Sequence, residues 1–337
     1  QAVCSGYRTE VRERTRCAHS GGMWKTCLAS LVLVSTCLRE RGVDSGRPRP
    51  QDLHLVREGA PAPKPKDFAP SCRPFPGKRI VLVTVTSDWM RYFRNWLHFA
   101  GPFLTSTEQL LVVAEDMEVV PLLQRFKLTA ARAPFKIVIP TSKADQASWN
   151  MSASADRHGS GDFYKLDIEE DKPYSSTAYK EIVSQRPLQI KHFLDMDCSV
   201  LYVDIDSAWL KNPFDEIGRA GSYEMYVTDD SRQDWGLKSD VLCSCFLYMH
   251  PTINAWVVIT DWAGLMAGEP DVNQAKFNKA FQTRLQYAPG FAVALPQREF
   301  PPGMDPIQKS PTVVHANGRL EDAKERYLKD HGAWSLD

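Results

Sequence analysis

The sequence predicts an α/β fold with a mainly parallel central sheet, formed as a single Rossmann-like domain. Short runs of β-branched and aliphatic residues alternate with longer segments whose apolar residues recur at helical spacing. Acidic residues or a histidine follow several of the apolar runs, where parallel strands leave the sheet toward one common edge. A hydrophobic share of 43% suits a chain that buries a core.

The first 42 residues are predicted to lie outside the folded body. Residues 1–22 are polar without apolar periodicity, and we expect Met23 to be the true start. The apolar run from Thr26 to Leu38 follows Lys25, and at about 13 residues it is shorter than the ~20 that span a bilayer. It is typical of a signal peptide or a signal anchor, with a buried core segment as the alternative.

Residues 43–77 are predicted to form a stem. They are rich in Pro, Arg and Lys and poor in aliphatic residues, and such a composition cannot bury a core. The catalytic body is therefore expected to span residues 78–337.

The elements of this body follow from the period of the apolar residues. Strands are expected, in chain order, at 80–86, 109–114, 136–139, 200–205, 225–228, 241–249, 291–295 and 312–315. Helices are expected at 92–99, 117–126, 178–195, 253–266, 273–285 and 320–328. Residues 140–176 form a polar stretch without a strong period, typical of a functional or disordered loop, and Pro187 predicts a helix start near residues 185–186.

A secretory route would permit disulfides among the cysteines. Four cysteines precede the stem and four follow it, namely Cys72, Cys198, Cys243 and Cys245. Oxidation would allow three pairings among the latter four. Cys243 and Cys245 stand too close for an easy mutual bridge and resemble half a zinc site, but no matching second pair supports zinc. The sequon Asn150-Met151-Ser152 is mild support for a lumenal body.

Asp204 and Asp206 carry the strongest chemical signal. They end an apolar run, and alternate residues of an extended strand point the same way, so both carboxylates can reach one ligand. Two hard oxygen ligands suit Mg²⁺ or Mn²⁺ carrying a diphosphate. A DXD triplet alone is a weak motif, and a solvated turn is the alternative. Ser87-Asp88, Asp229-Asp230 and His315 also fall at expected strand ends.

The run from residue 178 to residue 214 resembles the nucleotide-diphospho-sugar transferase family, and within it the xylosyltransferase-like branch of glycosyltransferase family 77. The specific part is Asp204-x-Asp206-x-x-Trp-Leu-Lys-Asn-Pro, and Cys245–Thr252, Asn273–Asn278 and Val313–Asn317 support it. The resemblance spans most of residues 78–320. It implies a GT-A fold, a UDP-sugar donor, a divalent metal (typically manganese) and retention of anomeric configuration.

The resemblance also implies a metal site. Asp206 matches the metal-binding carboxylate, and Asp204 the one that contacts the donor ribose, or the metal through water. His315 stands where related retaining enzymes supply a third metal ligand, with a structural histidine as the alternative. Neutral imidazole beside carboxylates is a suitable ligand set for Mn²⁺.

Contacts to the nucleotide are expected from two other segments. Arg186 falls where the family has a basic residue on the helix before the motif strand. A guanidinium there can hold a phosphate bidentately; a surface arginine is the alternative. Thr86 and Asp88, at the end of the first strand, are expected to contact the nucleoside.

The sugar pocket is where this chain departs from the family. Gln274 matches an amide near the anomeric carbon of the donor, but Asn273 replaces the usual Asp. Asp229 and Asp230 are candidates for binding donor sugar or acceptor, with a solvated turn as the alternative. Residues 243–245 stand where many family members have an Asn-Thr-Gly-like stretch. The acceptor or sugar contacts that the family makes there can therefore not be assigned to this chain.

The predicted function is a metal-dependent retaining glycosyltransferase that moves xylose or galactose from a UDP-sugar to a glycan or glycoprotein. Two rivals are a phosphohydrolase, which would need the Asp pair after its first strand, and a catalytically silent carbohydrate-binding or scaffold member of the same fold. The expected location is the Golgi lumen, as a type II membrane protein or a secreted form. A formal net charge of zero gives no indication of nucleic acid as a partner.

Overall fold

The computed structural model describes residues 71–129, 134–140, 163–166, 178–231, 241–268, 273–303, 310–319 and 321–336. The described residues belong to one compact unit spanning Arg49–Asp337. The predicted targeting segment, most of the predicted stem and the sequon at Asn150 lie outside them. None of the described helices has the length and apolar character needed to cross a membrane.

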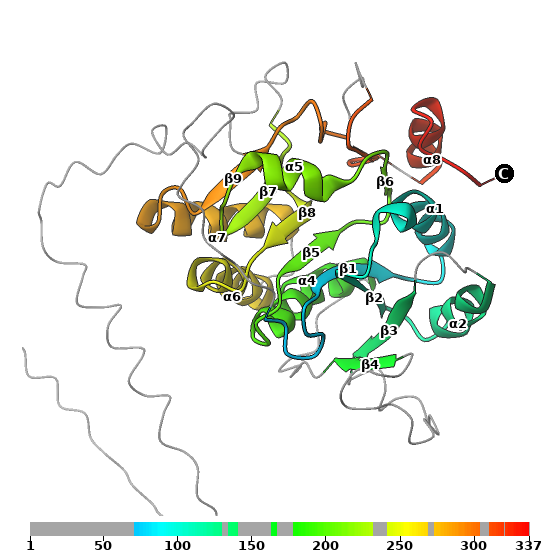
Figure 1. The fold of residues 1–337 in the computed structure, drawn as a ribbon, viewed down its shortest axis with the longest axis horizontal. Helices are drawn as coiled ribbons and strands as arrows, with labels where there is room; N and C mark the ends of the chain where they lie inside the picture. The colour runs from blue at the N-terminus through cyan, green and yellow to red at the C-terminus, as the bar shows by residue number, and fades with distance from the viewer. Residues whose placement is uncertain are drawn as a thin grey trace, which may run out of the picture. The chain divides into compact units, whose positions relative to one another are not determined.

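The centre of the body is a sheet with the strand order β4-β3-β2-β1-β5-β8-β7-β9 (Figure 1). Its strands are β1 (Arg79–Val85), β2 (Glu108–Ala114), β3 (Phe135–Pro140), β4 (Phe163–Leu166), β5 (Val200–Val203), β7 (Met225–Asp229), β8 (Leu242–Met249) and β9 (Ala292–Leu295). Within the described sheet, only β8 runs antiparallel to its neighbours. The predicted α/β fold with a mainly parallel sheet, as expected for GT-A, is confirmed.

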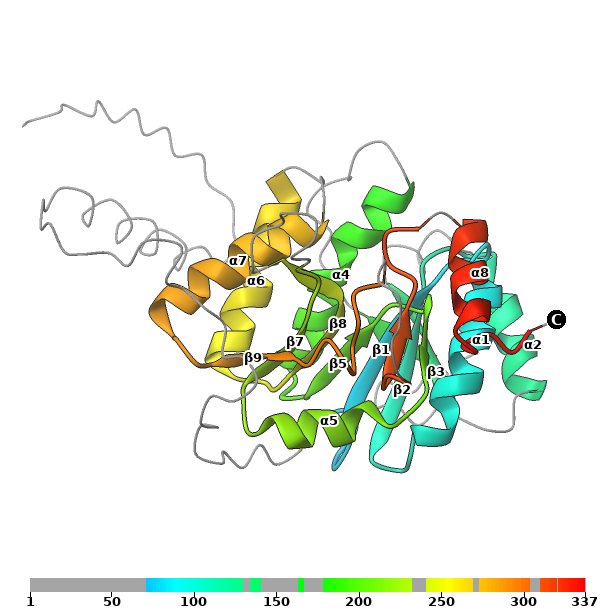
Figure 2. The same cartoon turned by 90° about the horizontal axis from the view of Figure 1, so that it is seen from above.

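Helices cover both faces of this sheet (Figure 2). One face packs against α1 (Met90–Ala100), α2 (Val119–Thr129), α5 (Pro213–Ala220) and α8 (Glu321–Asp330). The other packs against α4 (Ala178–Leu194), α6 (Ile253–Gly268) and α7 (Asn273–Tyr287). A short 3₁₀ helix, Gly101–Phe103, follows α1. Because side chains alternate along a strand, Val81 and Val83 enter one core while Ile80 and Leu82 enter the other.

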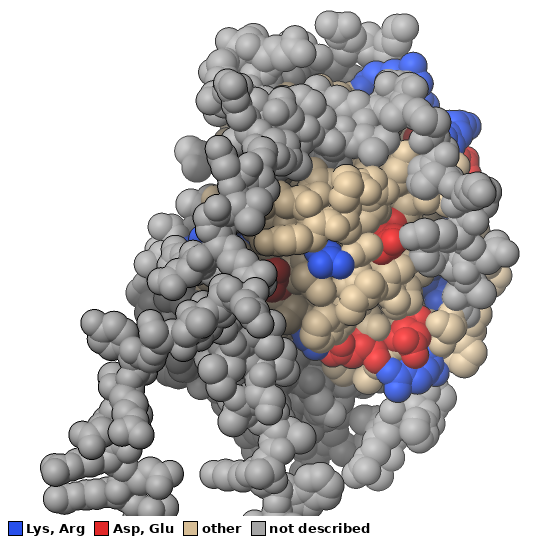
Figure 3. All heavy atoms as spheres, turned by 90° about the vertical axis from the view of Figure 1, so that its left-hand side faces the viewer, with Lys and Arg blue, Asp and Glu red and all other residues tan. Residues whose placement is uncertain are grey.

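Figure 3 views the left-hand side of Figure 1, where α6 and α7 lie. Most of the described surface on this side is uncharged, with a few separate charged groups. α6 and α7 carry the exposed apolar residues Ile253 and Tyr287. Single exposed apolar side chains are common on protein surfaces and carry no functional conclusion.

A second, two-stranded sheet brings the C-terminal part of the chain to the end of β5. β6 (Ser207–Trp209) pairs antiparallel with β10 (Val313–His315), and His315 lies opposite Ser207. Trp209 is fully buried and meets Trp96 of α1 edge to face, with 5.6 Å between ring centroids. This contact anchors the two-stranded sheet on the body.

Four elements differ from the expected ones. The predicted helix start at Pro187 is wrong, because α4 continues through this proline. An interior proline costs about 3 kcal/mol, and burial of Val183, Ile190 and Phe193 offsets it. β4 lies within the polar stretch expected to lack structure and pairs with β3 as a short edge strand. β6 and α5 were also not predicted, although Asn212 caps α5.

The described body includes residues ahead of the predicted start at residue 78. Cys72 and Phe75 are buried, and Cys72 forms a disulfide with Cys198, just before β5. The boundary between stem and body otherwise remains a prediction.

Candidate active site

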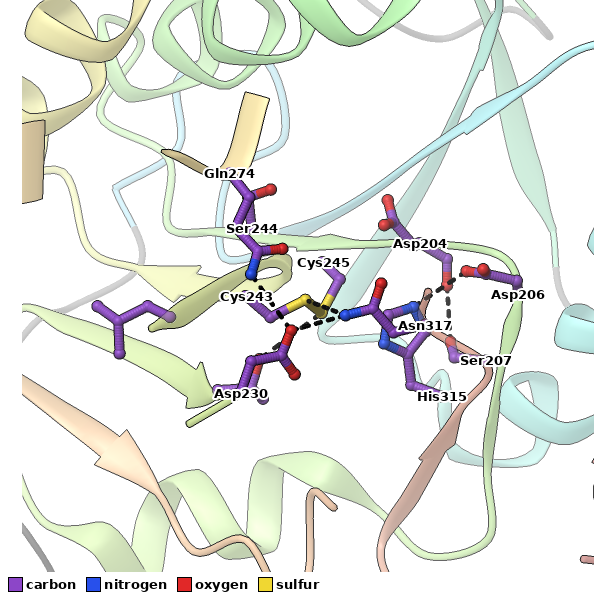
Figure 4. Close-up of a disulfide and its surroundings, with 12 residues drawn as sticks. Asp204, Asp206, Ser207, Asp230, Cys243, Ser244, Cys245, Gln274, His315 and Asn317 are labelled. Carbon is purple, nitrogen blue, oxygen red and sulfur yellow. Dashed lines mark hydrogen bonds and ion pairs between the residues drawn. A yellow bond between two sulfur atoms is a disulfide. The ribbon is translucent and has the colours of Figure 1, made fainter. Parts of the chain in front are cut away.

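The two aspartates lie where β5 ends, and backbone contacts fix the chain there. The Asp204 N–H donates to the carbonyl of Cys245 on β8 over 2.8 Å, and Ser207 Oγ donates to the Asp204 carbonyl over 2.6 Å. The chain therefore turns from β5 into β6 with both carboxylates at one edge of the sheet (Figure 4).

Asp206 is held by partners that arrive from the C-terminal part of the chain. Its Oδ1 lies 3.1 Å from Nε2 of His315, and its Oδ2 accepts a hydrogen bond from Nζ of Lys324 on α8. The carbonyl of Asp206 accepts from the N–H of Ala316 over 2.9 Å. The β6–β10 register thus explains why His315 lies beside this aspartate.

These contacts shift the titration of both groups. Burial opposes ionisation of Asp206, but the charges and hydrogen bonds of His315 and Lys324 outweigh it and hold the pKa of Asp206 far below its usual range. Burial alone would lower the pKa of His315, whereas the charge and hydrogen bond of Asp206 outweigh burial and raise this pKa. Asp206 is therefore ionised at neutral pH.

Asp204 has a different environment. Its Oδ1 accepts from the Tyr202 hydroxyl and pairs with Nη2 of Arg186, each over 3.0 Å. Arg186 also lies over the Tyr202 ring, 4.6 Å from its centroid. Burial raises the pKa of Asp204, the charge of Arg186 offsets part of this, and the charge of Asp206 adds to the rise. The two aspartates of the triplet are thus electrostatically unequal.

Asp204, Asp206 and His315 can hold a divalent metal. One ligand atom from each lies within 4.8 Å of the others. Mg²⁺ bonds of about 2.1 Å place neighbouring ligands about 3 Å apart and opposite ligands about 4.2 Å apart, so the spacing fits. Two carboxylates and an imidazole suit Mn²⁺ or Mg²⁺.

A second polar group lies around Asp230, just after the end of β7, and includes Gln274 and Asn317. Asp230 Oδ2 accepts from Nε2 of Gln274 over 3.3 Å and from Nδ2 of Asn317 over 2.6 Å. Burial raises the pKa of Asp230, and the charge of His315 and the two amide hydrogen bonds offset only part of the rise. The predicted Gln274 and Asp230 therefore do come together.

A small pocket lies between His315 and Asp230. Its polar lining comes from Ser207, Thr228, Asp230 and His315, together with Cys245. Its apolar lining comprises Val203, Phe246, Phe300, Pro301 and Val313. A hollow with a few converging polar groups and an apolar wall suits a small ligand.

Three predicted residues lie apart from the ligand group. The side chain of Asp229 accepts from the Ser231 N–H over 2.8 Å and so shapes the turn after β7. Thr86 and Asp88 lie in the loop between β1 and α1, and Asp88 is exposed. Within the described residues, none of the three belongs to a group that can ligate a metal.

The prediction that Cys243 and Cys245 do not bridge each other is wrong. They form a disulfide, as do Cys72 and Cys198. The register of β8 against β7 shifts here, since Val227 lies opposite Leu247 but the next residue, Thr228, lies opposite Cys243. This bulge brings the two Cα atoms to 5.2 Å, whereas a regular strand would hold them about 6.6 Å apart.

Tyr202, Asn317 and Lys324 are site residues that the sequence did not indicate. Tyr202 looks like an ordinary apolar strand residue, and Lys324 looks like one charge among many on an amphipathic helix. Of the three, only Asn317 could have been found from the sequence. It is the last residue of Val313–Asn317, a segment that resembles the family.

Known proteins share this sequence pattern. A profile of the nucleotide-diphospho-sugar transferase family matches residues 137–328. Among curated Arabidopsis thaliana proteins, UDP-D-xylose:L-fucose alpha-1,3-D-xylosyltransferase is 21% identical over 292 residues, covering 77% of this chain and 70% of that protein. UDP-D-xylose:L-fucose alpha-1,3-D-xylosyltransferase 3 is 24% identical over 282 residues, covering 74% and 72%.

Solved structures are more distant. The glycosyltransferase GlyE of Streptococcus pneumoniae TIGR4 gives a TM-score of 0.46 at 13% identity, over 75% of this chain and 59% of that chain. The bifunctional glycosyltransferase WbbM gives 0.47 at 11% identity, over 75% and 50%. The profile match, however, covers more than half of the 337 residues. The predicted enzyme class, a glycosyltransferase, is thereby confirmed, and the chain belongs to the nucleotide-diphospho-sugar transferase family.

Proposed function

We propose that this protein is a metal-dependent, retaining glycosyltransferase that moves xylose or galactose from a UDP-sugar to a glycan or glycoprotein acceptor. The observation that carries the proposal is the convergence of Asp204, Asp206 and His315 at the edge where β5 ends. The Arabidopsis relatives are named for UDP-D-xylose, which makes this sugar nucleotide the first donor to test.

Asp204, Asp206 and His315 would hold Mn²⁺ or Mg²⁺, which supplies Lewis-acid stabilisation to the charge that grows on a departing diphosphate. Arg186 and Lys324 flank the aspartates as buried or nearly buried cations. A donor diphosphate that binds here would lie close to both Arg186 and Lys324. Each cation could then donate hydrogen bonds to phosphate oxygens as well as to its aspartate.

The sugar would lie toward Asp230, Gln274 and Asn317. Their amide and carboxylate groups are already linked to one another, so they are preorganised to bind hydroxyl groups. Thr86 and Asp88 are proposed to contact the nucleoside, and Asp229 to act on donor sugar or acceptor through the turn that it shapes.

Retention requires the acceptor hydroxyl to arrive on the face from which the phosphate leaves, or a covalent intermediate. We favour front-face displacement, in which the departing phosphate takes the acceptor proton. Asp230 is already engaged by two amides, which argues against its use as a nucleophile. A glycosyl adduct trapped on Asp229 or Asp230 would contradict this mechanism.

The proposed location is the Golgi lumen, with the protein anchored as a type II membrane protein by its N-terminal segment or released as a secreted form. The two disulfides support an oxidising compartment.

The test is a panel of UDP-xylose, UDP-galactose and UDP-arabinose incubated with the purified protein and Mn²⁺. We expect hydrolysis of one donor, its abolition by EDTA and its recovery with added Mn²⁺. NMR of the freshly released sugar should show the anomer of the donor. Full activity in EDTA, or an inverted anomer, would contradict the proposal, while tight UDP binding without turnover of any donor would favour the silent, carbohydrate-binding alternative.

A further inference from the structure

The Cys243–Cys245 disulfide lies inside the site but has no role in the proposed reaction. In Figure 4 it lies between Asp230 on one side and His315 on the other. Cys243 Sγ is 3.6 Å from Nδ2 of Asn317. One sulfur of this disulfide, that of Cys245, therefore borders the same pocket as His315, which is one of the proposed metal ligands.

The two sulfurs and His315 form a second group of potential metal ligands. Their ligand atoms all lie within 4.8 Å of one another, as in the group with the two aspartates. Zinc–sulfur bonds of about 2.3 Å in a tetrahedral site place two thiolates about 3.8 Å apart, so the spacing fits once the sulfur–sulfur bond is open. Two thiolates and an imidazole select a thiophilic ion such as Zn²⁺ over Mn²⁺ or Mg²⁺.

The pocket gives an ion a path to two of these ligands, Cys245 and His315. Cys245, His315, Thr228 and Asp230 all line it. Three protein ligands leave the fourth tetrahedral position open toward the pocket, where water or the carboxylate of Asp230 can complete the set.

Contacts other than the bridge also hold the two cysteines. Cys243 lies opposite Thr228 of β7, and the Cys245 carbonyl accepts from the Asp204 N–H over 2.8 Å. The side chain of Asn278 on α7 also accepts from the Leu242 N–H and donates to the Leu242 carbonyl, each over 2.8 Å. A disulfide that closes so short a loop removes little entropy from the unfolded chain. The strand therefore holds both cysteines in place after reduction.

We propose that Cys243, Cys245 and His315 form a second metal site, for a thiophilic divalent ion such as Zn²⁺, that opens when the Cys243–Cys245 disulfide is reduced. The reductant is a dithiol, which transfers two electrons and two protons to the disulfide and itself becomes a cyclic disulfide. The ion then binds the two thiolates with release of two protons.

The two metal sites exclude each other, because they share His315. A neutral imidazole offers one nitrogen lone pair, so His315 serves one ion at a time. This consequence rests on the proposed function: reduction with Zn²⁺ present suppresses Mn²⁺-dependent sugar transfer. Removal of Zn²⁺ by a chelator, reoxidation, desalting and renewed addition of Mn²⁺ restore it.

The test uses the full chain with Cys4, Cys17, Cys27 and Cys37 changed to Ser, so that the thiols ahead of the body are absent. The protein is reduced with dithiothreitol, desalted without oxygen and titrated with Cd²⁺ while the ultraviolet thiolate-to-cadmium absorption is followed. We expect the thiolate-to-cadmium absorption to saturate at one equivalent of Cd²⁺ after reduction and to be absent before it. Zn²⁺ should displace the Cd²⁺ signal, and Mn²⁺ should not.

Two variants locate the site. Cys243→Ser/Cys245→Ser should show no absorption change. His315→Gln should bind Cd²⁺ more than about tenfold more weakly, because even loss of a hydrogen bond to a ligand costs about 10- to 100-fold in affinity. A further measurement does not depend on whether these variants fold. The reduced protein with Cys243 and Cys245 intact is alkylated and analysed by mass spectrometry, and Zn²⁺ should protect both thiols from alkylation.

Several results would overturn the proposal. They are a disulfide that stays closed in the folded, dithiothreitol-treated protein, two free thiols that bind no Cd²⁺, equal affinity in His315→Gln, or no protection by Zn²⁺. None of these measurements uses a sugar nucleotide. Failure of the glycosyltransferase proposal would instead appear in the oxidised protein with Mn²⁺, so the two failures are distinguishable.

Discussion

Asp206 shows most clearly how single residues set the chemistry of this site. Both carboxylate oxygens have a basic partner, His315 on one and Lys324 on the other, and all three side chains are nearly buried. A buried carboxylate is tolerated only with such compensation. The same compensation keeps Asp206 ionised, as the proposed role in metal binding requires.

Asp206→Asn should therefore abolish the proposed transfer. The amide keeps the shape but removes the negative charge, and we expect the rate to fall by at least about 100-fold, as for loss of one preorganised electrostatic group. The measurement is Mn²⁺-dependent donor hydrolysis, with Asp322→Asn, an exposed residue of α8, as the matched control. Unchanged activity in Asp206→Asn with an intact fold would refute the metal role.

At the scale of elements, two irregular features build the site on a regular sheet. The β8 bulge brings Cys245 to the wall of the pocket and Cys243 beside Asn317, and the β6–β10 pair carries His315 to Asp206. Bulges near active sites redirect side chains in this way. The segment around Gly303 supports β10 from outside, since a Cβ there would lie 2.3 Å from the His315 carbonyl and from the Asn317 N–H.

Gly303→Ala should push this segment off the His315–Asn317 backbone. We expect weaker Mn²⁺ binding and at least a tenfold loss of hydrolysis, roughly 1.4 kcal/mol, from a methyl group that touches no substrate. Gly264→Ala is the matched control: this exposed α6 glycine has open space for a Cβ. It should stabilise the protein by up to about 1 kcal/mol in urea unfolding. Equal, unaltered Mn²⁺ affinity in both variants would contradict the close approach at Gly303.

His250, just after β8, should make stability depend on pH. Burial and the charge of Arg79 lower the pKa of His250 to about 4, and Glu224 opposes this only in part. Since the unfolded imidazole titrates near 6.5, only the unfolded state takes up the proton between pH 6.5 and 4. The contribution of His250 to stability should fall by about 3 kcal/mol as the pH drops through that window and stay constant below it.

Urea unfolding at several pH values measures this effect. His250→Asn, which keeps a polar side chain near Ser199, should lose this part of the pH dependence. If the variant and the unmutated protein lose stability in parallel from pH 6.5 to 4, His250 is not the cause.

At the scale of the whole molecule, one sheet separates two cores and a long-range disulfide ties the described N-terminal part to them. Cys72 and Cys198 are both fully buried and lie 126 residues apart in sequence. The bridge fixes the segment ahead of β1 next to the start of β5, and Ser71 Oγ donates to the Asp197 carbonyl beside it.

Removing this bridge should cost far more stability than removing the one in the site. In the chain-entropy description, so long a loop is worth up to about 5 kcal/mol, whereas the short Cys243–Cys245 loop is worth less than about 2 kcal/mol. Thermal melts of Cys72→Ser/Cys198→Ser and Cys243→Ser/Cys245→Ser should show this order. Equal losses would mean that packing around the sulfurs, rather than loop closure, controls stability.

Local sequence was enough to predict the regular part of the fold. The β1, β2, β3 and β8 runs and the α1, α6 and α7 helices are long or strongly patterned, so their type follows from apolar periodicity. β4 and β6 are too short to carry such a signal, and burial against the sheet overrides the helix-breaking tendency of Pro187. The described parts of the chain therefore depart from expectation where tertiary contacts are stronger than local preference.

The sequence by itself determined the fold class, because strand alternation and strand ends are local properties of the chain. It also determined the family through the residues around Asp204 and Asp206 that resemble it, and this resemblance predicted that His315 joins the two aspartates. Only the tertiary structure decided that Lys324 meets Asp206, that Asn317 meets Asp230 and that two cysteines separated by one residue bridge each other. These contacts depend on the β6–β10 register and the β8 bulge. Such features arise from pairing between segments far apart in the chain, which no local pattern encodes.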